Sequence, residues 1–187
     1  RQLRRCSRYG SFLFCVVLHQ QRSSLGRSPA ASEVDKGQIL RGVFLMTQAE
    51  LDWFYGGGAG RFWPEVWARF VDLIPEDERG DFIEAYHKRL FSGDLGVEQG
   101  YGRAWAAWDN SLASVQADGV SHGGPSAYAR ACSRLENHYF INKGFLEFDG
   151  QILEHMGRIA HIPGTIVQGR YDMICPPAGA YELARRW

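Results

Sequence analysis

The stretch "TIVQGRYDMICPP", Thr165 to Pro177, places an acid directly behind a compact strand pattern. The β-branched residues that follow Gly164 predict a compact strand. Gly169 allows the chain to turn sharply after that strand, and the two prolines stiffen the exit. Ligands of open parallel sheets bind at the carboxyl ends of the strands. Asp172 is therefore predicted to lie at a functional edge of a sheet, although a simple turn acid would fit the same local pattern.

A second short apolar run, "QILRGVFLM" at Gln38 to Met46, also predicts a buried strand. Between the two runs, apolar residues recur at helical spacing, and Pro64 and Pro75 suit the first turns of two helices. "AYARACSRLENHYF" repeats Tyr128, Cys132, Leu135 and Tyr139 at that spacing. After the paired prolines, "AGAYELARRW" predicts one more helix.

The order of elements is therefore strand, a long helical section, strand and helix. If the two strands lie in one parallel sheet, the helices form a large insertion in the crossover between them. The sequence predicts an α/β fold. Its expected parts are an irregular segment at 1–37, a core strand region at 38–48, a helical domain at 49–160, and a core strand and helix at 161–187.

Composition argues against several classes of function. The 187 residues carry 21 basic and 21 acidic side chains, so a broad nucleic-acid surface is not expected. No apolar run approaches the roughly 18 residues that cross a bilayer, so no membrane span is expected. "GGGAG" lacks the strand before it and the helix after it that a phosphate loop has, and no GK[ST] follows. No metal or other cofactor is expected.

The four cysteines form no CxxC pair, and their scattered positions indicate free thiols. Free thiols are typical of a reducing compartment, so the expected location is cytoplasmic. The first 32 residues hold six Arg and no acid, which leaves an organelle or export signal open.

Several segments resemble one family in the right order. They are "LRGVFL", "ELDWFY", "RFWPEVWARF", "RAWAAWDNS", "RLENHYFINKGF" and "IPGTIVQGRYDMICPPAGAYEL". This set, spread over residues 38–187, is similar to prolyl aminopeptidases (proline iminopeptidases), which are serine peptidases of the α/β-hydrolase fold. The resemblance implies a partial α/β-hydrolase core of parallel strands, with a large helical cap inserted between two core strands. It also implies a serine exopeptidase that releases N-terminal proline from peptides, with such a peptide as the partner.

The resemblance assigns roles to three acids. Asp172 in "GRYD" matches the triad aspartate, which orients a catalytic histidine. Glu136 in "ENHYF" matches a cap glutamate that holds the substrate's terminal ammonium. Asp109 stands where the family carries a second such glutamate, so its side chain is one methylene shorter. The plain alternative makes both cap acids ordinary polar residues of helices.

The resemblance also assigns the pocket for the proline ring. The matching positions are Phe44 in "RGVF", Phe54 in "DWFY", where the family usually has tyrosine, and Phe140 in "ENHYF". Packing in a hydrophobic core would explain the same three residues.

Two parts of the family's machinery have no match. The sequence contains no G-x-S-x-G, and Ser11 in "YGSFL" is only a partial imitation at the wrong spacing. All six histidines precede Asp172, including His122 in "HGGP", whereas the family's histidine follows the aspartate. We therefore expect a truncated fragment that is inactive alone. Two alternatives stay open: a non-catalytic protein that binds peptide N-termini, and another α/β-hydrolase such as an esterase or epoxide hydrolase. The sequence predicts no oligomeric state.

Overall fold

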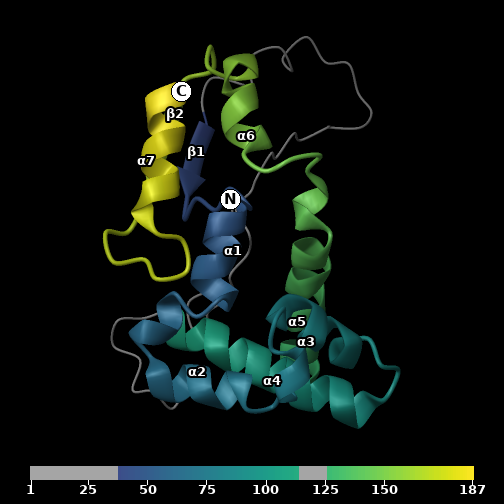
Figure 1. Ribbon diagram of the computed structural model, residues 1–187. Helices are drawn as coiled ribbons and strands as arrows, with labels where there is room; N and C mark the ends of the chain where they lie inside the picture. Colours follow the sequence, from purple (N-terminus) through teal and green to yellow (C-terminus); the bar gives the residue numbers. More distant parts are fainter. Residues whose placement is uncertain (1–37, 114–125) are drawn as a thin grey trace, which may run out of the picture.

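The computed structural model describes residues 38–113 and 126–187 (Figure 1). Predictions for the segment 1–37, for Ser11 and for His122 lie outside the described residues. The elements in chain order are β1 (Gln38–Arg41), α1 (Gln48–Tyr55), η2 (Ala59–Arg61), α2 (Pro64–Val71), η3 (Glu76–Glu78), α3 (Phe82–Leu90), α4 (Leu95–Leu112), α5 (Ser126–Ile141), η4 (Lys143–Phe145), α6 (Gln151–Glu154), η5 (His155–Arg158), β2 (Gly164–Val167) and α7 (Pro177–Arg186).

The two strands lie side by side, as the sequence predicts. β1 and β2 pair in parallel, with Gln38 opposite Gly164 and Arg41 opposite Val167. The helices α1 to α6 all fall between the two strands along the chain, and α7 follows β2. Figure 1 shows α7 and the strands together, with the long helices α4 and α5 farther away. The described structure is mostly helical with a small parallel two-stranded sheet, which is compatible with a partial α/β fold.

The first strand is shorter than predicted. Pairing ends at Arg41, because Gly42 turns the backbone with a φ of 63°. The next four residues are all buried, and their side chains alternate between two hydrophobic clusters, as in an extended chain. Val43 and Leu45 point into a cluster with α7, whereas Phe44 and Met46 point into the helical cluster. The apolar run that the sequence predicts as one strand is therefore a short strand followed by a segment that lies outside the sheet and is buried on both sides.

Local signals set most helix ends. α1 starts with a capping box, in which the Thr47 side chain accepts from the Glu50 N–H, and it ends at Gly56. α2 begins at Pro64, as predicted. The single helix predicted from Pro75 is wrong: η3 ends at Glu78, and α3 begins after Asp81, whose side chain caps the Glu84 N–H.

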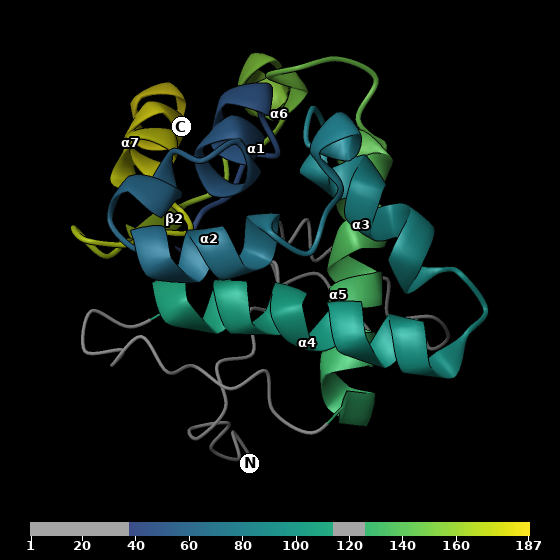
Figure 2. The ribbon, with the colours of Figure 1, turned by 60° about the horizontal axis from the view of Figure 1, so that its bottom comes forward.

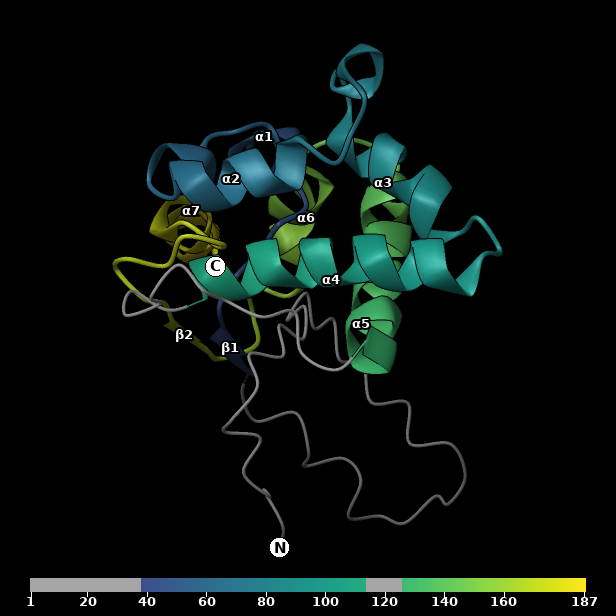
Figure 3. The ribbon, with the colours of Figure 1, turned by 90° about the horizontal axis from the view of Figure 1, so that it is seen from below.

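The helical cluster holds the largest buried side chains. α4 runs alongside α2 and crosses α5, and α3 packs near that crossing (Figures 2 and 3). Trp105 and Trp108 of α4 are fully buried there with Phe70 and Tyr86. Of the described helices, none is both long and apolar enough to cross a membrane.

The helix predicted around "ENHYF" is present as α5, but its inner face is not the one that the apolar repeat suggests. Leu135 and Tyr139 are 56% and 42% exposed. Glu136 and Phe140 lie on the buried side instead, so a carboxylate is turned into the helical cluster.

Candidate functional site

Two buried acids meet where α4 crosses α5. Asp109 is 7% exposed and Glu136 is 8% exposed, and their carboxyl groups lie within hydrogen-bonding reach of each other. In the described part of the chain, neither acid forms an ion pair with Lys, Arg or His. The structure thus brings together the two residues that the sequence predicts as ammonium ligands, without an ion-pair partner among the described residues.

Each acid accepts a hydrogen bond from one aromatic side chain. The Tyr55 hydroxyl donates to Asp109 Oδ1 at 3.1 Å, and Trp105 Nε1 donates to Glu136 Oε2 at 2.9 Å. The rings of Tyr55 and Trp105 are stacked, with centroids 4.5 Å apart. The sequence analysis missed both donors. A signal for Trp105 exists, because it precedes Asp109 by four residues and therefore shares its helix face.

Burial and mutual repulsion set the protonation of this pair. Burial, followed by the charge of Glu136, raises the pKa of Asp109 well above its usual range. Burial also raises the pKa of Glu136, against the hydrogen bonds from Asp109 and Trp105. The pKa of Tyr55 is raised by burial and by both acids, so its hydroxyl keeps its proton and acts as a donor. The pair is therefore suited to hold a proton, or a cation in its place.

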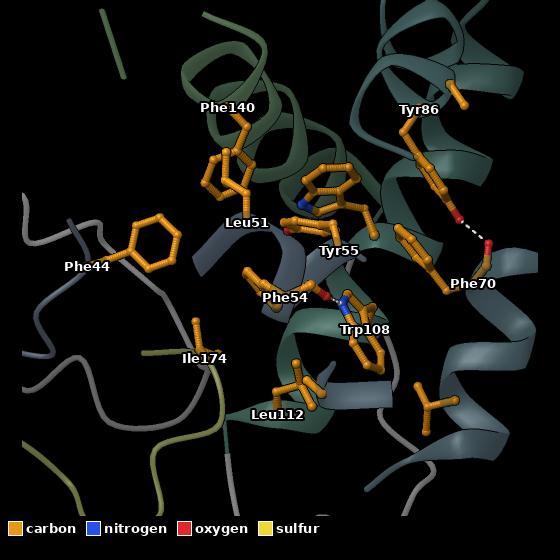
Figure 4. Packing of buried hydrophobic residues seen from close by; sticks show 14 of the residues in the cluster. Phe44, Leu51, Phe54, Tyr55, Phe70, Tyr86, Trp108, Leu112, Phe140 and Ile174 are labelled. Carbon is orange, nitrogen blue, oxygen red and sulfur yellow. Dashed lines mark hydrogen bonds between the residues drawn. The ribbon is translucent and has the colours of Figure 1, made fainter. Parts of the chain in front are cut away.

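Three phenylalanines from separate segments lie in the same aromatic cluster as Tyr55 (Figure 4). Phe44 comes from the segment after β1, Phe54 from α1, and Phe140 from α5, one turn beyond Glu136. The Phe140 ring lies 6.1 Å from Phe44, 6.5 Å from Phe54 and 5.3 Å from Tyr55, measured between centroids. The three phenylalanines that the resemblance assigns to a ring pocket are thus brought together, and all three are buried in the hydrophobic core.

Asp172 organises the turn after β2. Its Oδ1 accepts from the backbone N–H groups of Ile174 at 3.1 Å and Cys175 at 2.8 Å, and its Oδ2 accepts from Gln168 Nε2 at 3.1 Å. The half-buried carboxylate is therefore fixed by three donors. It makes no hydrogen bond with either cap acid in the described part of the chain.

Gln168 links this turn to the segment that carries Phe44. Its Oε1 accepts from the Val43 N–H at 2.8 Å, while its Nε2 donates to Asp172 and, at 2.7 Å, to the Cys175 carbonyl. Neither end of the amide can be reversed without losing these bonds. The sequence analysis missed Gln168, and the glutamine in "TIVQG" offers no signal beyond its position at the strand end.

The Asp172 turn also packs against α1. The Met173 carbonyl accepts from Trp53 Nε1 at 2.8 Å. Ile174 is buried in the same cluster as Phe44 and Phe54, as Figure 4 shows. The turn with the predicted catalytic acid therefore borders the aromatic cluster, even though Asp172 does not touch the acid pair.

The Cys175 thiol beside Asp172 is buried and unpaired. Burial, followed by the charges of Asp172 and Glu50, raises the pKa of Cys175 above its ordinary value. A protonated thiol is a poor nucleophile. Across the described residues, no cluster of His, Cys, Asp and Glu is arranged to hold a metal ion.

The chain is similar to several curated proteins. It is 44% identical to a proline iminopeptidase of Arabidopsis thaliana over 88% of its own length and 45% of the relative. It is 44% identical to the proline iminopeptidase of Neisseria gonorrhoeae, with 87% of the chain and 52% of the relative covered. The protein of that name from Xylella fastidiosa is 43% identical, with 80% and 48% covered. No protein-family model matches the chain.

The resemblance predicted from the sequence is therefore confirmed over most of the chain. The chain spans about half the length of the curated relatives that it matches.

Proposed function

Because its curated relatives are proline iminopeptidases, we propose that this chain is the substrate-recognition part of a serine exopeptidase that releases N-terminal proline from peptides. In this proposal, residues 49–160 form a helical cap inserted into a partial α/β-hydrolase core made by residues 38–48 and 161–187. The observation that carries the proposal is the buried pair Asp109 and Glu136 beside an apolar aromatic cluster.

The acid pair would bind the ammonium group at the peptide's N-terminus. Two carboxyls that repel each other gain most from a cation placed between them. A peptide with a blocked N-terminus would leave the buried acids without that partner, so it would be rejected. Asp109 is the shorter of the two acids, and its position depends on the Tyr55 hydroxyl.

The aromatic cluster would bind the proline ring. Phe44, Phe54 and Phe140 present apolar surface from three segments, and Phe140 also contacts Tyr55, which donates to Asp109. The nitrogen of an N-terminal pyrrolidine ring carries the cation, but its three methylene groups are apolar, so apolar contact suits them. Recognition would thus combine one cationic group with one adjacent apolar ring.

Asp172 would orient a histidine and stabilise its cationic form during acyl transfer. We propose that the serine and the histidine come from the part of the relatives' length that this chain does not cover. The recognition site and the acid are then contributed here, and the chain alone would bind peptides without cleaving them.

Hydrolysis of peptides by the protein encoded across this region tests the proposal. The coding sequence on either side should supply a G-x-S-x-G upstream and a histidine downstream. That protein should release proline from Pro-Ala-Ala, but not from its N-acetylated form, and Glu136→Gln should abolish the preference. Equal cleavage of both peptides would contradict the proposal, whereas binding without cleavage would favour a non-catalytic protein that binds peptide N-termini.

Free thiols support a location for this activity. Cys132 and Cys175 are unpaired in the described part of the chain. Unpaired cysteines persist in reducing compartments, so we place the proposed peptidase in the cytoplasm.

A further inference from the structure

Two stacked aromatic side chains hold the acid pair from one side. Tyr55 on α1 donates to Asp109 Oδ1, and Trp105 on α4 donates to Glu136 Oε2. We infer that Tyr55 and Trp105 are positioning residues: each fixes one oxygen of one acid, so that Asp109 and Glu136 share a single proton that the substrate's ammonium group replaces. The inference rests on the proposed function and specifies how its recognition site works.

Among the described residues, the groups that influence the pair most are carboxyls, phenols and a thiol. The titratable groups around it in the described residues are Tyr55 from α1, Tyr86 from α3, Asp109 from α4, and Cys132 and Glu136 from α5. Two ionised carboxylates in contact at such a buried place would repel strongly. One proton held between them removes the repulsion, and an external cation can do the same.

The hydrogen bonds decide which acid carries the proton. Tyr55 occupies Oδ1 of Asp109 as a donor, which leaves Oδ2 for the shared proton. Glu136 accepts both from Trp105 and from Asp109, so the ionised form of Glu136 is the better stabilised of the two. Asp109 is therefore the proton donor within the pair.

Tyr55 also compensates for the shorter acid. The family resemblance implies a glutamate at position 109, and the aspartate ends one methylene closer to α4. The Tyr55 ring is fixed by stacking on Trp105 and by edge contact with Phe140, so its hydroxyl has little freedom to move. A rigid donor holds the short carboxyl in reach of Glu136 at a small entropic cost.

Carbon-13 NMR of the side-chain carboxyls in the ligand-free chain tests the inference without any substrate. Tyr55→Phe should move the titration of Asp109 upward by roughly one pH unit, because the ionised form loses a donor. Tyr86→Phe is the matched control, since that buried hydroxyl donates to the Phe70 carbonyl at 2.8 Å. It should leave the titration of Asp109 in place. An unchanged titration in Tyr55→Phe, or equal shifts in both variants, would overturn the inference.

The partner donor gives an independent variant. Trp105→Phe removes the hydrogen bond to Glu136 but leaves Tyr55 in place. The titration of Glu136 should then move upward, and the proton should divide more evenly between the two acids. If the titration of Glu136 does not move, Trp105 only fills space.

Calorimetry with L-prolinamide links the pair to binding. The wild-type chain should release about one proton for each ligand bound, measured in two buffers of different ionisation enthalpy. At pH values below the shifted titration of Asp109, Tyr55→Phe should bind prolinamide roughly tenfold more weakly than the wild type does. At pH values far above that titration, the two should bind it equally well. Binding without proton release would overturn the inference that the two acids share one proton. If the wild type does not bind prolinamide at all, the proposed function fails, whereas the carboxyl titration still decides the roles of Tyr55 and Trp105.

Discussion

The Asp172 carboxylate stabilises the turn after β2 independently of any catalytic role. Its carboxylate accepts two backbone N–H groups and one side-chain amide, which together close the turn behind β2. A carboxylate held by three donors is also well oriented to accept a fourth, as a histidine-orienting acid must. The two roles therefore have to be separated by substitutions that affect the turn and the charge differently.

Asp172→Ala should lower the free energy of unfolding by about 1–3 kcal/mol, because it leaves half-buried donors unpaired. Asp172→Asn should cost less, since its carbonyl oxygen can still accept from Ile174 and Cys175 while its amide group opposes Gln168. Urea unfolding measures both. Asp149→Ala is the control, because that exposed acid accepts one backbone N–H from Gln48. Equal stability of all three variants would show that the turn does not need the carboxylate.

At the scale of elements, the crossing of α4 and α5 places the acid pair. Glu98, in the first turn of α4, binds Arg130 and Arg134 of α5 and also accepts from the Gly93 N–H. Arg134 donates to the Leu90 carbonyl at the end of α3 as well. One acid thus joins three helices. Its partner Arg134 precedes Glu136 on α5 by two residues.

Glu98→Gln should remove a pH dependence of stability. Burial alone would raise the pKa of Glu98, but the Gly93 N–H and the two guanidinium groups outweigh burial and lower it. The unfolded carboxyl therefore binds protons first as pH falls, and stability is lost below about 4.5, the ordinary pKa of glutamate. Thermal unfolding between pH 3 and 7 should show a flatter curve for the variant.

Glu84→Gln is the matched control for this element. Glu84 is exposed and pairs with Lys88 one turn later at 3.7 Å. Surface pairs of this kind contribute little to stability, so the pH curve should keep its wild-type shape. A curve equally flat in both glutamate variants would remove the special role of Glu98.

For the whole molecule, one four-residue segment joins two cores. Val43 and Leu45 pack with α7, while Phe44 and Met46 pack with the helices. Gln168 then ties the same segment to the Asp172 turn. The sheet side and the helical side share covalent and packing connections, so we expect the chain to unfold as one unit.

Leu45→Ala should lower the free energy of unfolding by about 2–4 kcal/mol, the usual cost of a truncated core leucine. Trp105 and Trp108 lie in the other cluster, so tryptophan fluorescence follows the helical side. It should still give one transition that coincides with circular dichroism, because residues 43–46 join the two clusters. Ile39→Ala, at a side chain that is 78% exposed, should change little. Two separate transitions in Leu45→Ala would show that the cores are independent.

The sequence by itself determined the parts that depend on neighbours along the chain. Pro64 starts a helix, Gly56 ends one, and the apolar runs near Gln38 and Thr165 form strands. Local backbone preferences act over a few residues, so such patterns can be interpreted without the fold. The family resemblance, confirmed over most of the chain, depends on the same short segments.

Only the tertiary structure decided which side chains meet. α5 buries Glu136 and leaves Leu135 56% exposed, the reverse of what the apolar repeat predicts. Tyr55 and Asp109 are 54 residues apart, and Gln168 and Val43 are 125 apart. No periodicity reports contacts at such separations, because burial depends on what packs from elsewhere. The acids could be predicted by type and position, but their shared environment exists only where α1, α4 and α5 converge.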